Sequence, residues 1–357
     1  MFGGDPGAGL GRMRPLVVAC LCSLLAACAT SPAPTRRIIE FRGPTMGTTY
    51  SVKVVTGPEG LSDAANLDRE IRTNLERMNA LMSTWDGESE LSRFNRFRST
   101  DSFTLSRETF EVFQWSQKIG ELTGGALDVT VASLLDAWGF GPGGKRDRVP
   151  DEAEIARLRQ AVGMHLFELD EATLTVRKKR PDVRCELSAV APGYAVDQLT
   201  TRLMARGFND FLVDVGGELR AQGRNEEGRP WQIAIERPDA GGAIGQRFVQ
   251  LSDHSMTTSG DYRNFYEVDG VRLTHILDPR TGRPITNRLA SVTVIDDLSV
   301  RADAFATALM VLGLDEGLAL SERLNLAALF LVRDEQGGFL ERTSSRFDTL
   351  TKASEQP

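Results

Sequence analysis

Residues 291–312, SVTVIDDLSVRADAFATALMVL, contain both kinds of element from which this chain is built. Alternating β-branched residues predict a strand over 291–295. Alanines and other good helix formers follow, and they predict a helix over about 302–312. Asp303 and Thr307 are the polar residues of this otherwise apolar helix. Because they are four residues apart, they share one face of the helix.

Two interpretations of this pair stay open at the level of sequence. Carboxylate and hydroxyl oxygens suit Mg²⁺, which prefers hard oxygen ligands. Alternatively, Asp303 lies near the helix N-terminus and interacts with the helix dipole, while the hydroxyl of Thr307 bonds to a backbone carbonyl.

Helices and strands are mixed along the rest of the chain without regular βαβ alternation. Apolar residues at helical spacing predict helices over about 62–82 and 106–122, and a third that includes Val196 and ends before Gly207. Further strands are predicted at 50–54, 211–215, 231–235, 248–251 and 327–332, with a hairpin over 266–273. The pattern predicts an α+β fold with mixed, largely antiparallel sheets and packed helices, in a single domain over 41–350.

Charge and cysteine usage exclude some classes of protein. The 357 residues carry a net charge of −7, and the one basic run, Arg177 to Arg180, is interpreted as a solvated loop. Nucleic acid is therefore not an expected partner. Three of the four cysteines, Cys20, Cys22 and Cys28, lie near the N-terminus, and only Cys185 remains in the body of the chain. No internal disulfide can form there, so a buried core must hold the domain.

Residues 1–27 are predicted to be a signal peptide. Two arginines precede an apolar run that ends at Ala27 and is too short to span a bilayer, which takes about 20 residues. Leu25-Ala26-Ala27-Cys28 resembles a lipobox, so Cys28 would carry lipid and residues 28–40 would form a flexible tether. This predicts a protein of the bacterial cell envelope, anchored to a membrane and facing the periplasm. The alternative is an ordinary signal with Cys28 incidental.

Three clusters in the first half carry candidate binding residues. Met46 with Gly47 offers a soft apolar surface beside a backbone that permits close approach. Trp85 could stack on a flat ring. Asp128, next to Ala126 and Leu127, interrupts an apolar run and needs a partner, either a helix end or a ligand hydroxyl. The alternative for Met46 and Trp85 is a place in the core.

Two later clusters lie at a predicted helix start and a predicted strand end. Residues 186–197 could present free backbone N–H groups to a phosphate, or could simply be a capped helix. His275 lies at a strand end beside a Pro-Arg-Thr-Gly turn, as a site residue or a structural one. No zinc, P-loop or Gly-x-Ser-x-Gly motif is present. These residues predict an exported domain with a candidate oxygen-ligand metal site, an aromatic surface and anion-binding turns.

Taken together, the clusters have the order and spacing of the ApbE family of FAD:protein FMN transferases, which the chain resembles from Gly43 to Phe347. The resemblance is carried by these motifs: Met46-Gly-Thr48, Ser83-Thr-Trp85, Leu91-Ser-Arg-Phe-Asn95, Trp138-Gly-Phe-Gly-Pro142, Gly193-Tyr-Ala-Val-Asp197, Val215-Gly-Gly217, His275-Ile-Leu-Asp-Pro-Arg-Thr-Gly282 and Ala302-Asp-Ala-Phe-Ala-Thr307.

The resemblance implies a role for each candidate residue. The FAD site would be lined by Met46, Trp85, Ala126, Leu127, Asp128 and Glu186. Glu186 stands where the family usually has an aspartate. The carbonyl of Ala189, with Asp303 and Thr307, would hold Mg²⁺ near the FAD diphosphate, and His275 would lie near the reacting phosphates. Pro192 stands where the family pattern Ala-Lys-Gly-Tyr has a lysine suited to phosphate or cofactor contacts.

The resemblance also implies a reaction. A Thr or Ser oxygen of an acceptor flavoprotein, by analogy a subunit of a membrane redox complex, attacks the FMN phosphorus of FAD, and AMP leaves. His275 or Asp303 could accept the hydroxyl proton. The alternative is an FAD-binding lipoprotein that transfers weakly or not at all, because Pro192 replaces the lysine.

Overall fold

The computed structural model describes Met1 and residues 36–353, apart from 146–147, 238–244, 263 and 269–270. The predicted signal peptide and Cys28 lie outside the described residues, so the predictions made for them stay predictions.

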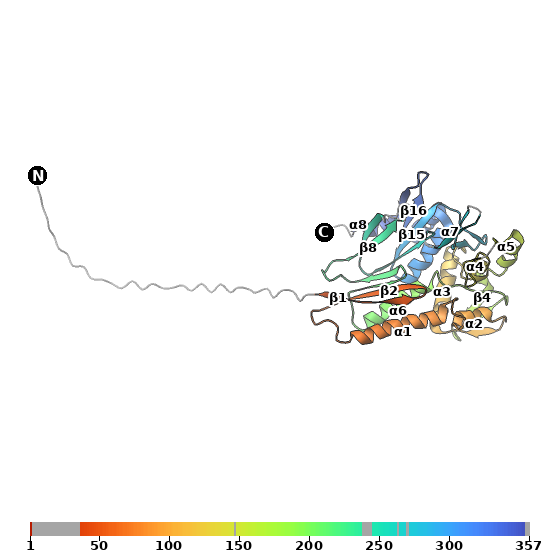
Figure 1. Ribbon diagram of the computed structural model, residues 1–357, viewed down its shortest axis with the longest axis horizontal. Helices are drawn as coiled ribbons and strands as arrows, with labels where there is room; N and C mark the ends of the chain where they lie inside the picture. The colour runs from red at the N-terminus through yellow and green to blue at the C-terminus, as the bar shows by residue number, and fades with distance from the viewer. Residues whose placement is uncertain (2–35, 146–147, 238–244, 263, 269–270, 354–357) are drawn as a thin grey trace. The chain divides into compact units, whose positions relative to one another are not determined.

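An antiparallel sheet of eight strands forms the centre of the domain that begins at Arg36 (Figure 1). Every neighbouring pair in it is antiparallel, which confirms the predicted fold class. In spatial order the strands are β1 (Arg37–Thr45), β2 (Thr48–Thr56), β6 (Phe211–Val215), β7 (Glu218–Gln222), β10 (His254–Gly260), β15 (Leu289–Asp296), β16 (Ala327–Arg333) and β17 (Phe339–Thr343).

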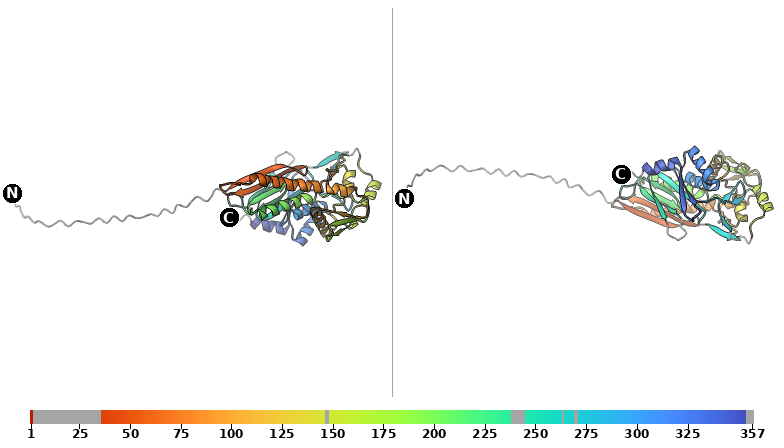
Figure 2. Two further views of the ribbon diagram at one scale, coloured as in Figure 1. Left: turned by 90° about the horizontal axis from the view of Figure 1, so that it is seen from below. Right: turned by 90° about the horizontal axis from the view of Figure 1, so that it is seen from above.

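Alternate residues of these strands pack into two separate cores. In β16, Ala328 and Phe330 join the larger core, whereas Ala327 and Leu329 join the smaller one. The face of the sheet that carries the larger core is covered by three helices: α1 (Ala64–Met82), α6 (Ala191–Ala205) and α7 (Ser299–Leu324). Figure 2 shows α1 in orange and α6 in green across this face. The other face is covered by the hairpin β8 (Trp231–Arg237) and β9 (Gly245–Leu251), with α8 (Ser345–Ala353).

Smaller elements gather at the end of the sheet to which the turn after β1 points (Figure 1). The helices there are α2 (Glu90–Arg96), α3 (Arg107–Leu122), α4 (Ala132–Ala137) and α5 (Glu152–Arg159), and a 3₁₀ turn spans Met164–Leu166. The strands are β3 (Ser102–Thr104), β4 (Phe167–Asp170), β5 (Thr175–Lys178), the hairpin β11 (Phe265–Val268) and β12 (Val271–Thr274), and the pair β13 (Leu277–Asp278) and β14 (Arg283–Pro284).

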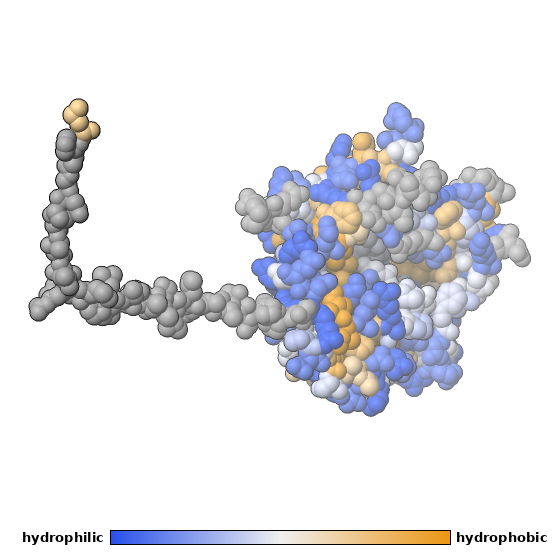
Figure 3. Space-filling model, turned by 60° about the vertical axis from the view of Figure 1, so that its left-hand side comes forward, coloured by the Kyte–Doolittle hydropathy of each residue, from blue (hydrophilic) through white to orange (hydrophobic). Residues whose placement is uncertain are grey.

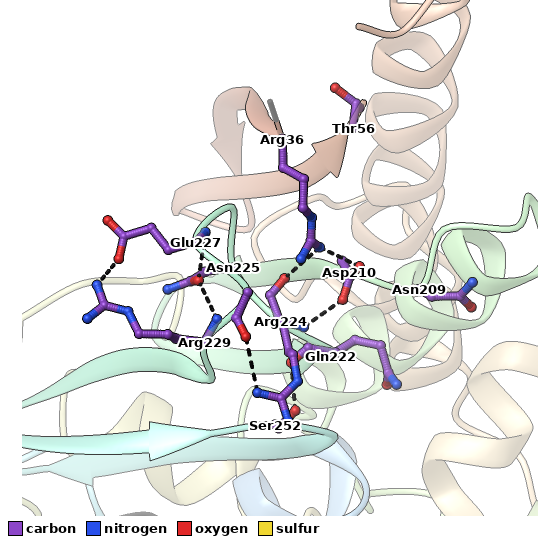
Figure 4. Close-up of polar contacts among 12 residues, drawn as sticks. Arg36, Thr56, Asn209, Asp210, Gln222, Arg224, Asn225, Glu227, Arg229 and Ser252 are labelled. Carbon is purple, nitrogen blue, oxygen red and sulfur yellow. Dashed lines mark hydrogen bonds and ion pairs between the residues drawn. The ribbon is translucent and has the colours of Figure 1, made fainter. Parts of the chain in front are cut away.

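Strand β1 begins earlier than the sequence suggests. Residues 37–40, predicted as part of the tether, belong to the sheet because Arg37 to Thr45 pair with β2 along their whole length. Just before the strand, Arg36 donates to Asp210 at 2.5 Å, and Asp210 accepts the backbone N–H of Arg224 at 2.6 Å (Figure 4). These contacts fix the point at which the chain enters the domain.

The prediction of a solvated loop at 177–180 is wrong for Arg177 and Lys178, which belong to β5, and above all for Lys178, which is buried; Lys179 and Arg180 lie in the bend that follows. Lys178 ends β5 and is buried, with its Nζ donating to the carbonyl oxygens of Phe94 at 2.8 Å and Phe97 at 3.0 Å. Those carbonyls belong to the end of α2, where lysine side chains commonly complete the hydrogen bonding. Burial lowers the pKa of Lys178 to about 8.

Helix α7 is longer than the predicted 302–312 and lies in the core. It passes Gly313, whose φ of 78° interrupts the helical conformation. Within the described residues it alone is long and apolar enough to cross a membrane, but most of it is buried inside the domain. Figure 3, which brings the left-hand side of Figure 1 forward, shows a narrow apolar band between hydrophilic flanks, with smaller apolar areas toward the top and the right of the view.

Candidate functional site

A cavity of about 940 Å³ collects the residues that the sequence motifs single out. It lies at the end of the sheet that carries the turn between β1 and β2, and its walls come from that turn, the end of α1, the segments before α4 and α6, and α7. The predicted residues lining it are Met46, Trp85, Ala126, Leu127, Asp128, Glu186, Ala189, Pro192, His275, Asp303 and Thr307. Its volume is in the range of small-molecule and cofactor sites.

The cavity is acidic. Five carboxyl groups line it, and among its described lining residues there is no Lys or Arg; the acids are Asp86, Asp128, Glu186, Glu218 and Asp303. Burial raises the pKa of Asp128, Glu186 and Asp303, because ionised carboxylates lose hydration there. A bound cation would compensate these charges, whereas an anionic ligand alone would add to them.

Asp303 lies in the second turn of α7 rather than at its first residues. The N-terminus of α7 is capped by Asp197 of α6, whose carboxylate oxygens accept the N–H groups of Ser299 and Val300, both at 2.9 Å. Asp303 itself accepts the N–H of Gly193 at 3.0 Å and is 3% exposed. Asp303 is therefore not the residue that caps α7.

Thr307 faces the cavity one turn after Asp303. Its hydroxyl oxygen lies 3.2 Å from that of Ser259, at the end of β10. No three His, Cys, Asp or Glu side chains of the described residues converge as a ligand cluster. A cation at this place would therefore depend on a mixed oxygen set, and the Asp303 carboxylate, the Thr307 hydroxyl and the Ala189 carbonyl supply the types that Mg²⁺ accepts.

Two further carboxyls of the cavity, both half-buried, are held by local hydrogen bonds. Asp128 accepts the N–H of Thr130 at 2.8 Å and its hydroxyl at 2.5 Å, so its partner here is a neighbouring residue and not a helix end. Glu186 accepts the hydroxyl of Thr84 at 2.5 Å and the N–H of Ser188 at 3.0 Å. Both side chains are thus fixed in orientation at the cavity wall before any ligand binds.

The apolar and aromatic candidates, Met46 and Trp85, differ in how far they are buried. Trp85 is 70% exposed and lies three residues after the end of α1, so its interpretation as a core residue is wrong. Met46 has a φ of 46° in the turn before β2; it packs partly against the core and also lines the cavity. A planar ring entering the cavity would find the exposed face of the Trp85 indole at its edge.

The start of α6 offers no free amides to a phosphate at its first positions. Ala191 donates its N–H to Leu187, Gly193 donates to Asp303, and Pro192 has no N–H. This part of the sequence forms a capped helix, which is the second of the two interpretations. Pro192 occupies the first turn of α6, where proline is favoured.

His275 is held in one tautomer. Its ring Nδ1 lies 2.9 Å from the carbonyl oxygen of Asn264, which can only accept, so Nδ1 carries the proton and neutral Nε2 has the lone pair. Burial lowers the pKa of His275, and this keeps the ring neutral. The ring is therefore prepared to accept a proton through Nε2.

Several residues around the site carried little or no signal in the sequence. Asp197 ends one of the motifs quoted above, but nothing in the sequence assigns a role to it or to Ser259. Arg333 is the last residue of the apolar strand β16, and in the sequence it resembles any surface arginine. Its hydrogen-bond partner is Asp261, which follows β10 and is 72 residues away in the sequence, so only the fold reveals the contact.

Comparison with known proteins relates the chain to one family. The sequence profile of the ApbE family matches residues 46–330. An FAD:protein FMN transferase of Vibrio cholerae is 42% identical over 335 residues, covering 94% of this chain and 98% of that protein. One from Haemophilus influenzae is 37% identical over 350 residues, covering 96% of this chain and all of that protein.

Solved structures agree in fold. The flavin transferase ApbE from Vibrio cholerae superposes with a TM-score of 0.82 at 40% identity, over 88% of this chain and 99% of that one. The flavinyl transferase ApbE of Pseudomonas stutzeri, in its apo form, superposes with a TM-score of 0.81 at 39% identity, over 88% and 97%.

Proposed function

Since the chain belongs to the ApbE family of flavin transferases, we propose that it moves FMN from FAD, with Mg²⁺, onto a Ser or Thr hydroxyl of an acceptor flavoprotein. AMP is the leaving group. By analogy within the family, the acceptor is a subunit of a membrane redox complex.

The proposed Mg²⁺ dependence rests on one observation, the acidic lining of the cavity. The FAD diphosphate is anionic, and it would enter a cavity lined by five carboxyls with no Lys or Arg among the described lining residues. Such an approach is repulsive unless a cation lies between the two sets of charges. Ala189, Asp303 and Thr307 are the residues that would hold Mg²⁺, which neutralises charge on the phosphates during transfer.

The protein's own residues account for the remaining steps. Trp85 and Met46 offer the flavin ring an aromatic and a soft apolar contact, and the other lining residues exclude water. The acceptor oxygen attacks the phosphorus of the FMN half, its proton passes to Nε2 of His275, and the bond to the AMP phosphate breaks. Between the two candidate bases His275 is preferred, because Asp303 would be engaged as a ligand.

The direct test uses the purified protein with FAD, Mg²⁺ and candidate acceptor flavoproteins. Covalent flavin fluorescence on the acceptor, with one AMP released per flavin attached, is the expected result, and EDTA should remove both. Transfer that continues undiminished in EDTA would refute the metal dependence. Absence of covalent flavin on all acceptors, with FAD bound, would favour the FAD-binding lipoprotein.

Pro192→Lys is expected to strengthen FAD binding about tenfold and to raise transfer. A charge-assisted hydrogen bond contributes about 1.5–3 kcal/mol. The new ammonium group would be the one Lys or Arg among the described lining residues. Quenching of flavin fluorescence on titration gives the affinity, and Pro192→Gln is the control for loss of the proline alone. Equal affinity of the Lys and Gln variants would show that this position does not contact the cofactor.

Cys28→Ser is expected to move the protein from the membrane fraction to the soluble fraction with its activity unchanged. We propose that Cys28 carries the lipid, because of its place in Leu-Ala-Ala-Cys, and a thioether-linked lipid cannot form on serine. Fractionation followed by immunoblotting measures the partition, with Cys20→Ser as the control within the signal. Identical partition of wild type and Cys28→Ser would refute the anchor.

A further inference from the structure

A partly buried ionic cluster lies next to the cavity, where β10 and β16 end on the two sides of β15. Asp261 follows β10 and accepts two hydrogen bonds from Arg333, at 2.5 and 2.9 Å. The Asp261 side chain is 12% exposed. Arg333 also donates to the carbonyl of Leu289 at 2.9 Å, so its guanidinium is fixed on both sides. A bidentate pair of this kind has a defined orientation as well as a favourable energy.

A second arginine reaches Asp261 from the hairpin β11–β12. Arg272 donates to the backbone carbonyl of Asp261 at 2.9 Å, and its guanidinium lies 3.9 Å from the Asp261 carboxylate. The same guanidinium lies 3.8 Å from the ring centroid of Phe265 on the neighbouring strand. Asp261 therefore joins the hairpin to the main sheet through one side chain and one carbonyl.

His275 depends on the segment that Asp261 fixes. It follows β12 directly, and both its backbone N–H and its ring Nδ1 donate to the carbonyl of Asn264, at 3.2 and 2.9 Å. Asn264 is three residues after Asp261. Displacement of this segment would turn the imidazole or release it from its single acceptor.

We propose that Asp261, held by Arg333 and Arg272, is a positioning residue that fixes the ring of His275 at the cavity wall and places a negative charge near it. The catalytic consequence rests on His275 being the proton acceptor proposed above. The positioning itself does not, and it is measured separately.

The charge of Asp261 and the burial of the ring shift the pKa of His275 in opposite directions. The Asp261 carboxylate raises the pKa of His275, while burial lowers it by more. The Asn264 carbonyl and the ring of Phe140, 6.4 Å away, face it at short range. Further charged groups among the described residues are the carboxyls of the cavity and Arg272 on β12, and Lys145 lies over the ring of Tyr266 on β11. None of these groups is altered by a substitution at Asp261 or Arg333.

Titration of the histidine resonances by NMR, without Mg²⁺ or FAD, tests the positioning. The chain has only three histidines, so His275→Gln assigns the signal, and His165 and His254 serve as internal references. Asp261→Asn should weaken proton binding to His275 at least about threefold, because a negative charge is lost. Arg333→Gln should strengthen it by a similar factor, because Asp261 loses its main counter-charge.

The opposite directions separate this role from a merely structural one. If the cluster only held the fold together, both variants would expose His275 and both would strengthen its proton binding. Asp261→Glu, which keeps the charge, should retain the wild-type titration, and Asp170→Asn at the exposed end of β4 should have no effect. An unchanged His275 titration in Asp261→Asn, or shifts of the same sign in Asp261→Asn and Arg333→Gln, would overturn the proposal.

Transfer kinetics then test the catalytic consequence. Asp261→Asn should lower kcat while KM for FAD stays unchanged, and the acidic limb of the pH profile should move to lower pH. This sign follows because a base is active only when unprotonated, and the variant loses its proton at lower pH. An acidic limb that stays in place while the NMR titration shifts would refute His275 as the base and leave the positioning role intact.

Discussion

Asp303→Asn is expected to lower Mg²⁺-dependent transfer by at least about 100-fold while the domain stays folded. Loss of a group that only orients a metal ligand costs about 10–100-fold in metal affinity or activity, so loss of the one carboxylate in the proposed ligand set should cost at least as much. Asparagine has the same shape and can still accept the N–H of Gly193, but it carries no negative charge.

Stability should not fall in this variant. Burial raises the pKa of Asp303 above its value in the unfolded chain. An acid whose pKa is raised by folding destabilises the fold once the pH exceeds the unfolded value, because the ionised form is disfavoured in the native state. Without Mg²⁺ at neutral pH, asparagine removes that cost, so Tm should equal or exceed that of the wild type.

Three measurements test the predictions for Asp303→Asn: transfer rate against Mg²⁺ concentration, Mg²⁺ affinity by calorimetry in the presence of FAD, and Tm. Asp315→Asn is the matched control, since Asp315 is exposed on the same helix. A variant with wild-type transfer and an unaltered Mg²⁺ dependence would remove Asp303 from the site. A lower Tm in metal-free buffer would contradict the account of its burial.

Gly193→Ala is expected to destabilise the domain by roughly 1–3 kcal/mol, the usual cost of overpacking a close contact, and to reduce transfer about as strongly as Asp303→Asn. A Cβ at this position would lie 2.5 Å from the carbonyl oxygen of Ser299 and 2.8 Å from the Cβ of Asp303. The obstructing atoms belong mainly to the backbone of α7, so the two helices would have to separate.

Separation of α6 from α7 would have consequences inside the cavity. Gly193 donates its N–H to Asp303, and Ala189 lies two residues before α6, so the proposed metal ligands depend on this contact. Gly57→Ala is the control, because a Cβ there meets nothing within 4 Å. Urea denaturation measures the stability, and the transfer assay measures the activity. A Gly193→Ala protein with wild-type stability and transfer would mean that the helices adjust without disturbing the site.

The sequence predicted the kinds of element and most of their centres. The strands at 211–215, 291–295 and 327–332 lie at β6, β15 and β16, and the helices near 62–82 and 106–122 are α1 and α3. These predictions succeeded because the period of apolar residues is a local property that reports the face turned to the core. Family motifs also named the residues that line the cavity, although the residues alone did not place them together.

Boundaries and charged partners were decided only by tertiary structure. Residues 37–40 appear tether-like until β2 provides hydrogen-bond partners, and Lys178 appears solvent-exposed until the end of α2 provides carbonyl acceptors. The cap of α7 by Asp197 joins residues about 100 positions apart, and Arg333 reaches Asp261 across 72. A charged side chain carries no periodic signal that identifies its partner. Its burial and pairing follow from which elements the sheet brings into contact, so they become readable only after the core has formed.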